Sequence, residues 1–118
     1  MFQLFKKKAI QVEITNLDYA PQLLLDQLPF CIKLIRQIPG KDRPDYWIAK
    51  LDKPLLWTSS EISYLIVGAR FTGSVIQKGM GRIVLGIALV VDESLLNDAS
   101  LDFSKCEYVA IGEAVEIQ

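Results

Sequence analysis

The sequence predicts a β-rich α+β fold, in which a largely antiparallel sheet of five or six strands, able to curl toward a barrel, carries one short helix. Three observations predict this class. Several segments alternate apolar and polar residues with the period of two that a half-buried strand requires. Two more segments are almost wholly apolar, as in strands covered on both faces. One stretch, near residues 19–28, combines good helix formers with start and stop signals.

The length of 118 residues corresponds to a single globular domain over 1–118, because domains of about 100–150 residues are the commonest size. With 13 basic and 14 acidic side chains, the formal net charge is −1, which leaves no basic excess for nucleic acid. The longest apolar run, at 83–91, is far shorter than the roughly 18 residues of a membrane helix, and the amino terminus lacks the order of a secretory signal. We therefore expect a cytoplasmic protein with no membrane span and no nucleic-acid partner.

The amino-terminal half predicts a strand, the helix and a hairpin. Residues 9–15 alternate, and the leucine-rich stretch that follows has a proline near its first turn and is stopped by Pro29. Residues 30–51 are interpreted as a β-hairpin with a polar tip that ends before Pro54, although part of the segment also fits a helix. If this hairpin lies at a sheet edge, its unpaired backbone groups offer a place for a partner to dock.

The carboxyl-terminal half predicts the centre of the sheet. Residues 62–71 and 82–91 are nearly apolar on both faces. One capped helical turn is expected at 92–98, and 106–117 returns to alternation, with a bulge expected at Gly112 and the following glutamate.

Histidine is absent, which excludes the Ser-His-Asp and Cys-His catalytic arrangements and His-ligated zinc. The two cysteines, Cys31 and Cys106, are too few and too far apart for a structural zinc site, and we expect buried free thiols. A bridge requires that their strands be neighbours. No cofactor is expected.

Two further motifs resemble ligand sites in composition. The segment 79–82, Gly-Met-Gly-Arg, has the bare amides and the arginine that can receive phosphate, but it lacks the spacing of a phosphate loop, and a turn is the preferred interpretation. Asp92, Glu93, Asp98 and Asp102 form an acidic cluster without the spacing of a calcium loop, and capping of turns accounts for such residues. No metal site is therefore predicted.

Candidate binding residues lie at the hairpin tip. Arg43, Tyr46 and Trp47 are of the residue types that are enriched at interface hot spots. Trp47 has a second interpretation, as an anchor of the hairpin in the core.

Arg70 is the fourth candidate, because it interrupts an apolar segment on the face that carries Ile62, Tyr64 and Ile66. An arginine that points inward must meet a carboxylate or an anionic ligand, since burying an unpaired charge is prohibitive. The alternative is an arginine that leaves the strand into solvent.

The carboxyl-terminal half also carries a resemblance, in the segments 64–71 (Tyr-Leu-Ile-Val-Gly-Ala-Arg-Phe), 86–96 (Gly-Ile-Ala-Leu-Val-Val-Asp-Glu-Ser-Leu-Leu) and 101–112 (Leu-Asp-Phe-Ser-Lys-Cys-Glu-Tyr-Val-Ala-Ile-Gly). This half resembles small uncharacterised bacterial domains, some of which accompany polymorphic toxins as candidate immunity proteins. The resemblance includes no catalytic signature. It implies a stand-alone cytoplasmic protein that acts by binding.

The function expected from the sequence is therefore protein interaction, with inhibition of a partner, as by an immunity protein, as the specific hypothesis. We expect the partner to be another protein, and the sequence leaves open whether the chain forms a homo-oligomer. The alternative is a small-molecule-binding or carboxylate-dependent enzyme domain that uses Arg70 or the cluster from Asp92 to Asp102. A pocket in which Arg70 meets carboxylates favours the alternative, and an aromatic hairpin tip on a convex surface favours protein interaction.

Overall fold

The computed structural model describes residues 9–38, 46–97 and 102–117, most of which lie in six strands. The strands are β1 (Gln11–Asp18), β2 (Phe30–Ile38), β3 (Tyr46–Trp57), β4 (Ser60–Ala69), β5 (Arg82–Val90) and β6 (Cys106–Ile117). The helices are α1 (Gln22–Leu25) and the 3-10 helices η2 (Glu93–Asn97) and η3 (Phe103–Lys105). The prediction of a β-rich α+β fold is confirmed.

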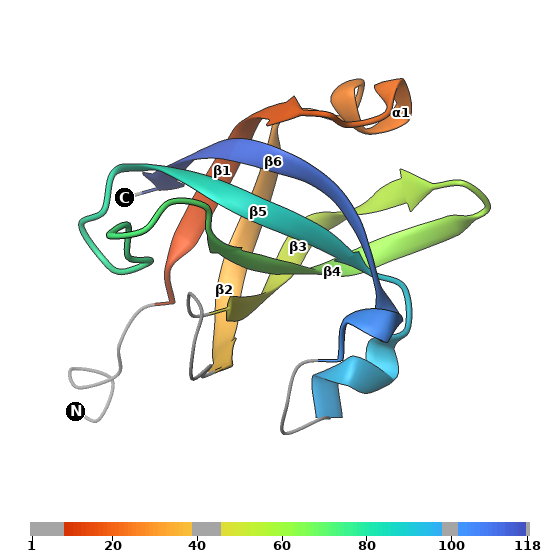
Figure 1. Ribbon diagram of the computed structural model, residues 1–118. Helices are drawn as coiled ribbons and strands as arrows, with labels where there is room; N and C mark the ends of the chain where they lie inside the picture. Colours follow the sequence, from red (N-terminus) through yellow and green to blue (C-terminus); the bar gives the residue numbers. More distant parts are fainter. Residues whose placement is uncertain (1–8, 39–45, 98–101, 118) are drawn as a thin grey trace, which may run out of the picture.

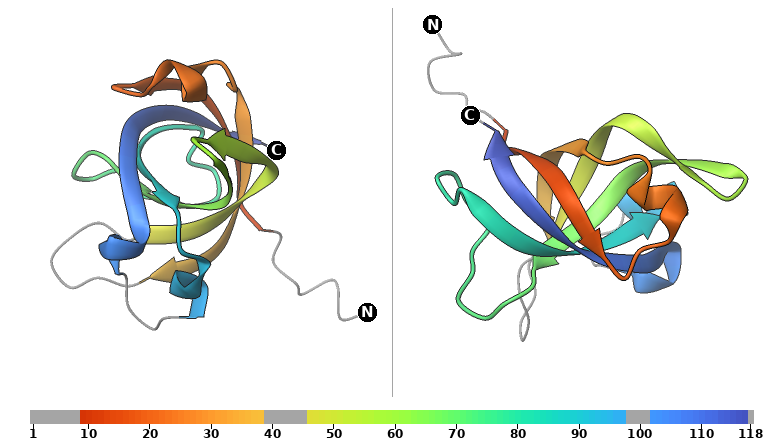
Figure 2. Two further views of the ribbon diagram at one scale, coloured as in Figure 1. Left: turned by 90° about the vertical axis from the view of Figure 1, so that its right-hand side faces the viewer. Right: turned by 90° about the horizontal axis from the view of Figure 1, so that it is seen from above.

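The six strands form a closed antiparallel barrel in which sequence neighbours are also spatial neighbours (Figure 1). The ring closes between the first and last strands, where Gln11 pairs with Ile117 and Asp18 with Ile111. The left panel of Figure 2 shows the ring of strands from one end. Because β2 and β3 each pair on both sides, the hairpin is not at a sheet edge, and the expected docking at an unpaired edge is wrong.

The helix is present but is shorter than the predicted stretch of 19–28. It spans four residues, begins after the extended Pro21 and ends at Leu25, with Asp26 as its C-cap. The side-chain amide of Gln27 then pairs with the backbone of Leu56 in β3, donating to its carbonyl at 3.0 Å and accepting from its N–H at 2.8 Å. This tertiary contact takes the place of a further helical turn and fastens α1 to β3.

Strand β3 does not end at Pro54, as the sequence suggested, but continues to Trp57. From Lys50 to Leu55, β3 advances five residues while its partner β4 advances only two, from Tyr64 to Ile62. Pro54 lies in this bulge, where the missing N–H of a proline breaks no ladder bond. The hairpin of β3 and β4 therefore extends beyond the ring of strands (Figure 1).

The bulge expected at Gly112 and Glu113 is absent from that position. Irregular pairing occurs instead in β1 opposite Glu113, between Ile14 and Asn16, and between β5 and β6 next to Ile87. Gly112 serves close packing, since a Cβ there would lie 2.6 Å from Cδ1 of Ile87. A side chain at this position would collide with the barrel interior.

Two hydrophobic clusters lie on opposite faces of β2 to β5, and the interior one also includes residues of β1 and β6. The interior cluster fills the barrel with residues such as Leu65, Val67 and Ile87, together with Leu24 of α1. The outer cluster lies on the outside of β2 to β5, where η2 inserts Leu95; its other buried members are Ile38, Ile48, Ile66, Ala88 and Val90. The prediction that β4 and β5 are covered on both faces is confirmed where they carry the two clusters, whereas Val84 and Gly86 on the outer face of β5 are only half-buried. None of the helices in the described part of the chain has the length and apolar character needed to span a bilayer.

Candidate functional site

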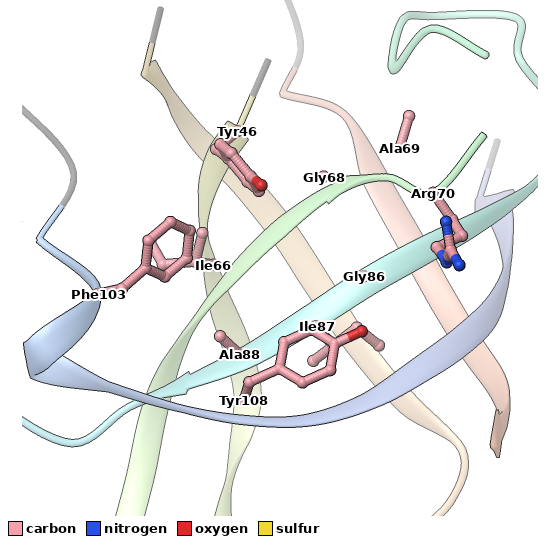
Figure 3. A pocket seen from close by; sticks show the side chains of 10 residues that line it. All are labelled: Tyr46, Ile66, Gly68, Ala69, Arg70, Gly86, Ile87, Ala88, Phe103 and Tyr108. Carbon is pink, nitrogen blue, oxygen red and sulfur yellow. The ribbon is translucent and has the colours of Figure 1, made fainter. Parts of the chain in front are cut away.

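A groove of about 290 Å³ crosses the outside of the barrel beside the outer cluster. It is formed by β3 to β6 and η3, and Figure 3 shows its side chains. The groove, which we call the glycine groove, is lined by Tyr46, Ile66, Gly68, Ala69, Arg70, Gly86, Ile87, Ala88, Phe103 and Tyr108.

Two glycines form the floor of the glycine groove. Strand register places Tyr46 opposite Gly68, and Gly68 opposite Gly86, in a row across three strands. Two adjacent positions of the outer face therefore have no side chain. A Cβ at Gly86 would lie 3.9 Å from both the Gly68 carbonyl and the ring of Tyr108, in ordinary van der Waals contact, so the fold does not require a glycine there.

Aromatic side chains border this floor. The rings of Tyr46 and Phe103 meet edge to face, with centroids 5.4 Å apart at an interplanar angle of 81°. Tyr108 of β6 extends over the floor from the other side and is 66% exposed. Exposed aromatic area beside a backbone floor is a surface that a flat or apolar group can cover.

Arg70 lies at the end of the groove away from Phe103 (Figure 3). It directly follows β4, its N–H donates to the carbonyl of Val84 at 2.9 Å, and its exposed guanidinium stacks on Phe71 at 5.6 Å from the ring centroid. Among the described residues, no carboxylate pairs with this guanidinium. Arg70 thus leaves the strand into solvent and also lines a pocket.

One of the three residues predicted to share a strand face with Arg70 lies on the other face. Tyr64 and Ile66 belong to the outer cluster, as the alternation predicted, but Ile62 packs in the interior cluster. The bulge of β3 opposite this part of β4 changes the pairing between Ile62 and Tyr64, so simple alternation fails there.

The structure places Tyr46 and Arg70 in the same groove, toward opposite ends, and separates Trp47 from them. Trp47 lies on the opposite face of β3 and packs against the interior cluster, so its interpretation as a core anchor is the one the structure supports. Its indole Nε1 is buried without a hydrogen-bond partner in the described part of the chain. Arg43 lies outside the described residues.

Sequence reasoning missed Phe103, Tyr108 and the two floor glycines. A signal for the glycines was available, because a glycine inside a strand often marks a close approach or a missing side chain. Both Gly68 and Gly86 interrupt apolar strands. Nothing local indicated the two aromatic residues, which reach the groove through tertiary packing.

The backbone N–H groups of the turn at Gly79 and Gly81 do bind an anion, which is the side-chain carboxylate of Glu116 in the same chain. Both glycines have positive φ, +86° and +66°. Their N–H groups donate to Oε1 of Glu116 at 2.8 Å and 3.4 Å, and the Glu116 N–H donates to the carbonyl of Gly81 at 2.8 Å. The predicted turn is confirmed, and its amides are already occupied.

Asp92 and Asp102 of the acidic cluster cap short helices, and Asp98 lies outside the described residues. Asp92 accepts from the N–H of Ser94 at 3.0 Å, and Asp102 accepts from the N–H and the hydroxyl of Ser104 at 3.0 Å and 2.6 Å. These serine hydrogen bonds lower the pKa of both carboxyl groups. No group of three or more potential metal ligands occurs in residues 9–38, 46–97 and 102–117.

Both cysteines are free thiols, but each is only half-buried, whereas burial was expected. Cys31 lies in β2 and Cys106 in β6, two strands that flank β1 without pairing with each other. Burial is the main cause that raises the pKa of both thiols, that of Cys106 to about 11. Cys31 also lines a second cavity of about 390 Å³ beside Pro29 and the β3 bulge, and Glu13 and Asp52 raise its pKa further. Neither thiol has the lowered pKa of a nucleophile.

No family model, curated protein or solved structure matches this chain. The resemblance of the carboxyl-terminal half to immunity-type domains therefore stays a prediction, and function is inferred from the geometry of the glycine groove.

Proposed function

We propose that this chain is a protein-interaction domain whose binding site is the glycine groove, where a side chain of a partner protein docks. The observation that carries the proposal is the pairing of Gly68 with Gly86 beneath the exposed ring of Tyr108. A floor of bare backbone between aromatic walls lets an incoming group contact several surfaces at once. Aromatic residues that surround a small central pocket are typical of interaction hot spots.

The lining of the groove supports binding over acid–base chemistry. Its described lining contains one cation, Arg70, two tyrosines and no carboxylate, so the arrangement of Arg70 with converging carboxylates that would favour an enzyme is not formed there. A general acid or base must lie within hydrogen-bond reach of its substrate. The volume of about 290 Å³ is at the small end for a ligand pocket and suits a single large side chain.

The specific role that we propose is inhibition of the bound partner in the cytoplasm, as by an immunity-type protein. The implied mode of action is steric: the domain covers a surface that the partner needs. The groove supports this role, because it can recognise a protruding side chain without performing chemistry on it.

Selection from a library of random displayed peptides tests the proposal. Wild-type protein should enrich a family of related peptides, and Gly86→Val and Tyr108→Ser should each weaken the selected peptide's affinity at least about tenfold. Tyr19→Ser is the matched control, because Tyr19 is also an exposed tyrosine but lies outside the groove. Failure to enrich any peptide family, or equal affinity of the groove variants and wild type, would refute the proposal.

A further inference from the structure

Building on the proposed function, we infer that the glycine groove recognises an acidic segment of its partner, in which a carboxylate adjoins an aromatic or large apolar side chain. The apolar side chain covers Gly68 and Gly86, and the carboxylate pairs with Arg70. The occupant is thus a chain segment of a second protein with a definite chemistry at two adjacent points.

The first argument is charge. Arg70 is the one charged residue among the described residues that line the groove, and no described carboxylate neutralises it. Its stacking on Phe71 orients the guanidinium while leaving its N–H donors available. A planar guanidinium binds a carboxylate through two parallel hydrogen bonds, which a neutral group cannot reproduce.

The second argument is that another anion-receiving feature of the molecule is already filled. The N–H groups of Gly79 and Gly81 hold the carboxylate of Glu116, so this turn presents no vacant amides. Arg70 has no such internal partner in the part of the chain described here, and an external carboxylate would provide one.

The third argument is the arrangement of apolar surface next to that charge. The edge-to-face pair of Tyr46 and Phe103 closes the end of the groove opposite Arg70, so an apolar group on the floor has rings on two sides. The hydroxyl of Tyr108 points toward the Arg70 end (Figure 3), where it can donate to the same carboxylate. Polar recognition lies at one end and apolar contact at the other.

Two probes of nearly identical shape test this inference: N-acetyl-L-phenylalanine, which carries a carboxylate, and N-acetyl-L-phenylalaninamide, which does not. Each is titrated into 15N-labelled protein and followed by NMR. The acid should shift the backbone amides of Gly68 and Gly86, and it should bind about tenfold more tightly than the amide.

Arg70→Gln should reduce the affinity for the acid to that for the amide and leave the affinity for the amide unchanged. Arg82→Gln is the matched control, because Arg82 is an exposed arginine of β5 that does not line the groove. Preserved amide spectra establish that both variants fold.

Equal affinity for the two probes, no binding of the acid, or shifts confined to other surfaces would overturn the inference. These outcomes are distinct from failure of the proposed function. If the displayed peptides bind in the groove but lack an acidic residue beside the apolar one, the interaction domain stands and the acidic preference is wrong. If no peptide family is enriched, the proposed function itself fails.

Discussion

The interior and outer clusters of this barrel are built on the same strands, yet they differ in how completely they are covered. The interior cluster joins buried side chains from all six strands, and α1 adds Leu24 from one connection. On the outside, η2 covers the region around Leu95, and beyond it the surface opens into the glycine groove. The comparison shows that one strand can contribute a sealed core on one face and an open groove on the other.

Truncation of leucines should separate the two clusters most strongly. Leu65→Ala in the interior should lower the free energy of unfolding by about 2–5 kcal/mol, because the ring of strands cannot collapse around the cavity. Leu95→Ala, at an equally buried site, should fall at the low end of that range, since the short η2 can move inward. Urea denaturation of both variants measures the difference. Equal losses would show that the outer cluster is as rigid as the interior.

Two glycines provide a sharper version of the same comparison. Gly112→Ala should cost about 1–3 kcal/mol, because its methyl group would lie 2.6 Å from Ile87 and 3.2 Å from the Asn16 carbonyl. Gly86→Ala should cost nothing and can add up to about 1 kcal/mol, since its methyl group meets only ordinary contacts and the unfolded chain loses freedom. The melting temperatures of the two variants, measured by thermal unfolding, distinguish the two effects. A destabilised Gly86→Ala protein would mean that the floor of the groove is required by the fold.

The turn held by Glu116 packs Met80 only at the margin of the interior cluster and should contribute less. Glu116→Ala leaves the N–H groups of Gly79 and Gly81 to water, and we expect a loss of about 1 kcal/mol. Glu113→Ala, on the same strand, is the control, because its exposed side chain makes no such contact. Slower hydrogen exchange at Gly79 in wild type than in the Glu116 variant identifies the contact directly. Identical exchange would contradict it.

The thiols report on partial burial at two different places. At pH 8 an alkylating reagent should modify both slowly in the folded protein and rapidly in denaturant, with Cys106, whose pKa is raised to about 11, the slower of the two. A raised folded pKa favours the protonated thiol, so its contribution to stability is complete below the unfolded value of 9.0 and is lost as the pH rises toward 11. The variants Cys31→Ser and Cys106→Ser assign each rate. Rapid modification of Cys106 in the folded protein would contradict its burial.

The smallest effect should come from the capping carboxylates at the rim of the outer cluster. Hydrogen bonds from Ser94 and Ser104 lower the pKa of Asp92 and Asp102 below the ordinary value of 3.8. A lowered folded pKa means that their contribution is present above the unfolded value and is lost as the pH falls through the folded one. NMR titration measures the pKa of both carboxyl groups in wild type and in the variants Ser94→Ala and Ser104→Ala, in which the loss of the serine hydroxyl should raise the pKa of the neighbouring aspartate. A pKa at or above 3.8 would contradict the capping.

Local chemistry was sufficient for much of the fold. The alternating strands, the doubly apolar β4 and β5, the proline-bounded helix and the capping aspartates all follow from interactions within a few residues. Prediction failed where distant segments interact. Gln27 pairs with Leu56 and α1 stops early, while the β3 bulge lets the strand pass Pro54.

The candidate site likewise divides into residues that local sequence indicated and residues that only distant contacts placed. Arg70 and Tyr46 stood out by residue type and position, whereas Trp47 needed the structure to place it on the inner face. The sequence by itself determined roughly where the strands lie, though not the ends of β1 and β3, and that two strands are apolar on both faces, because side-chain period and hydrophobicity are local properties. Only the tertiary structure decided that the sheet closes, that Gly68 lies beside Gly86, and that Phe103 of η3 reaches Tyr46 of β3. Those contacts depend on strand register and on the packing of distant segments, which no short stretch of sequence specifies.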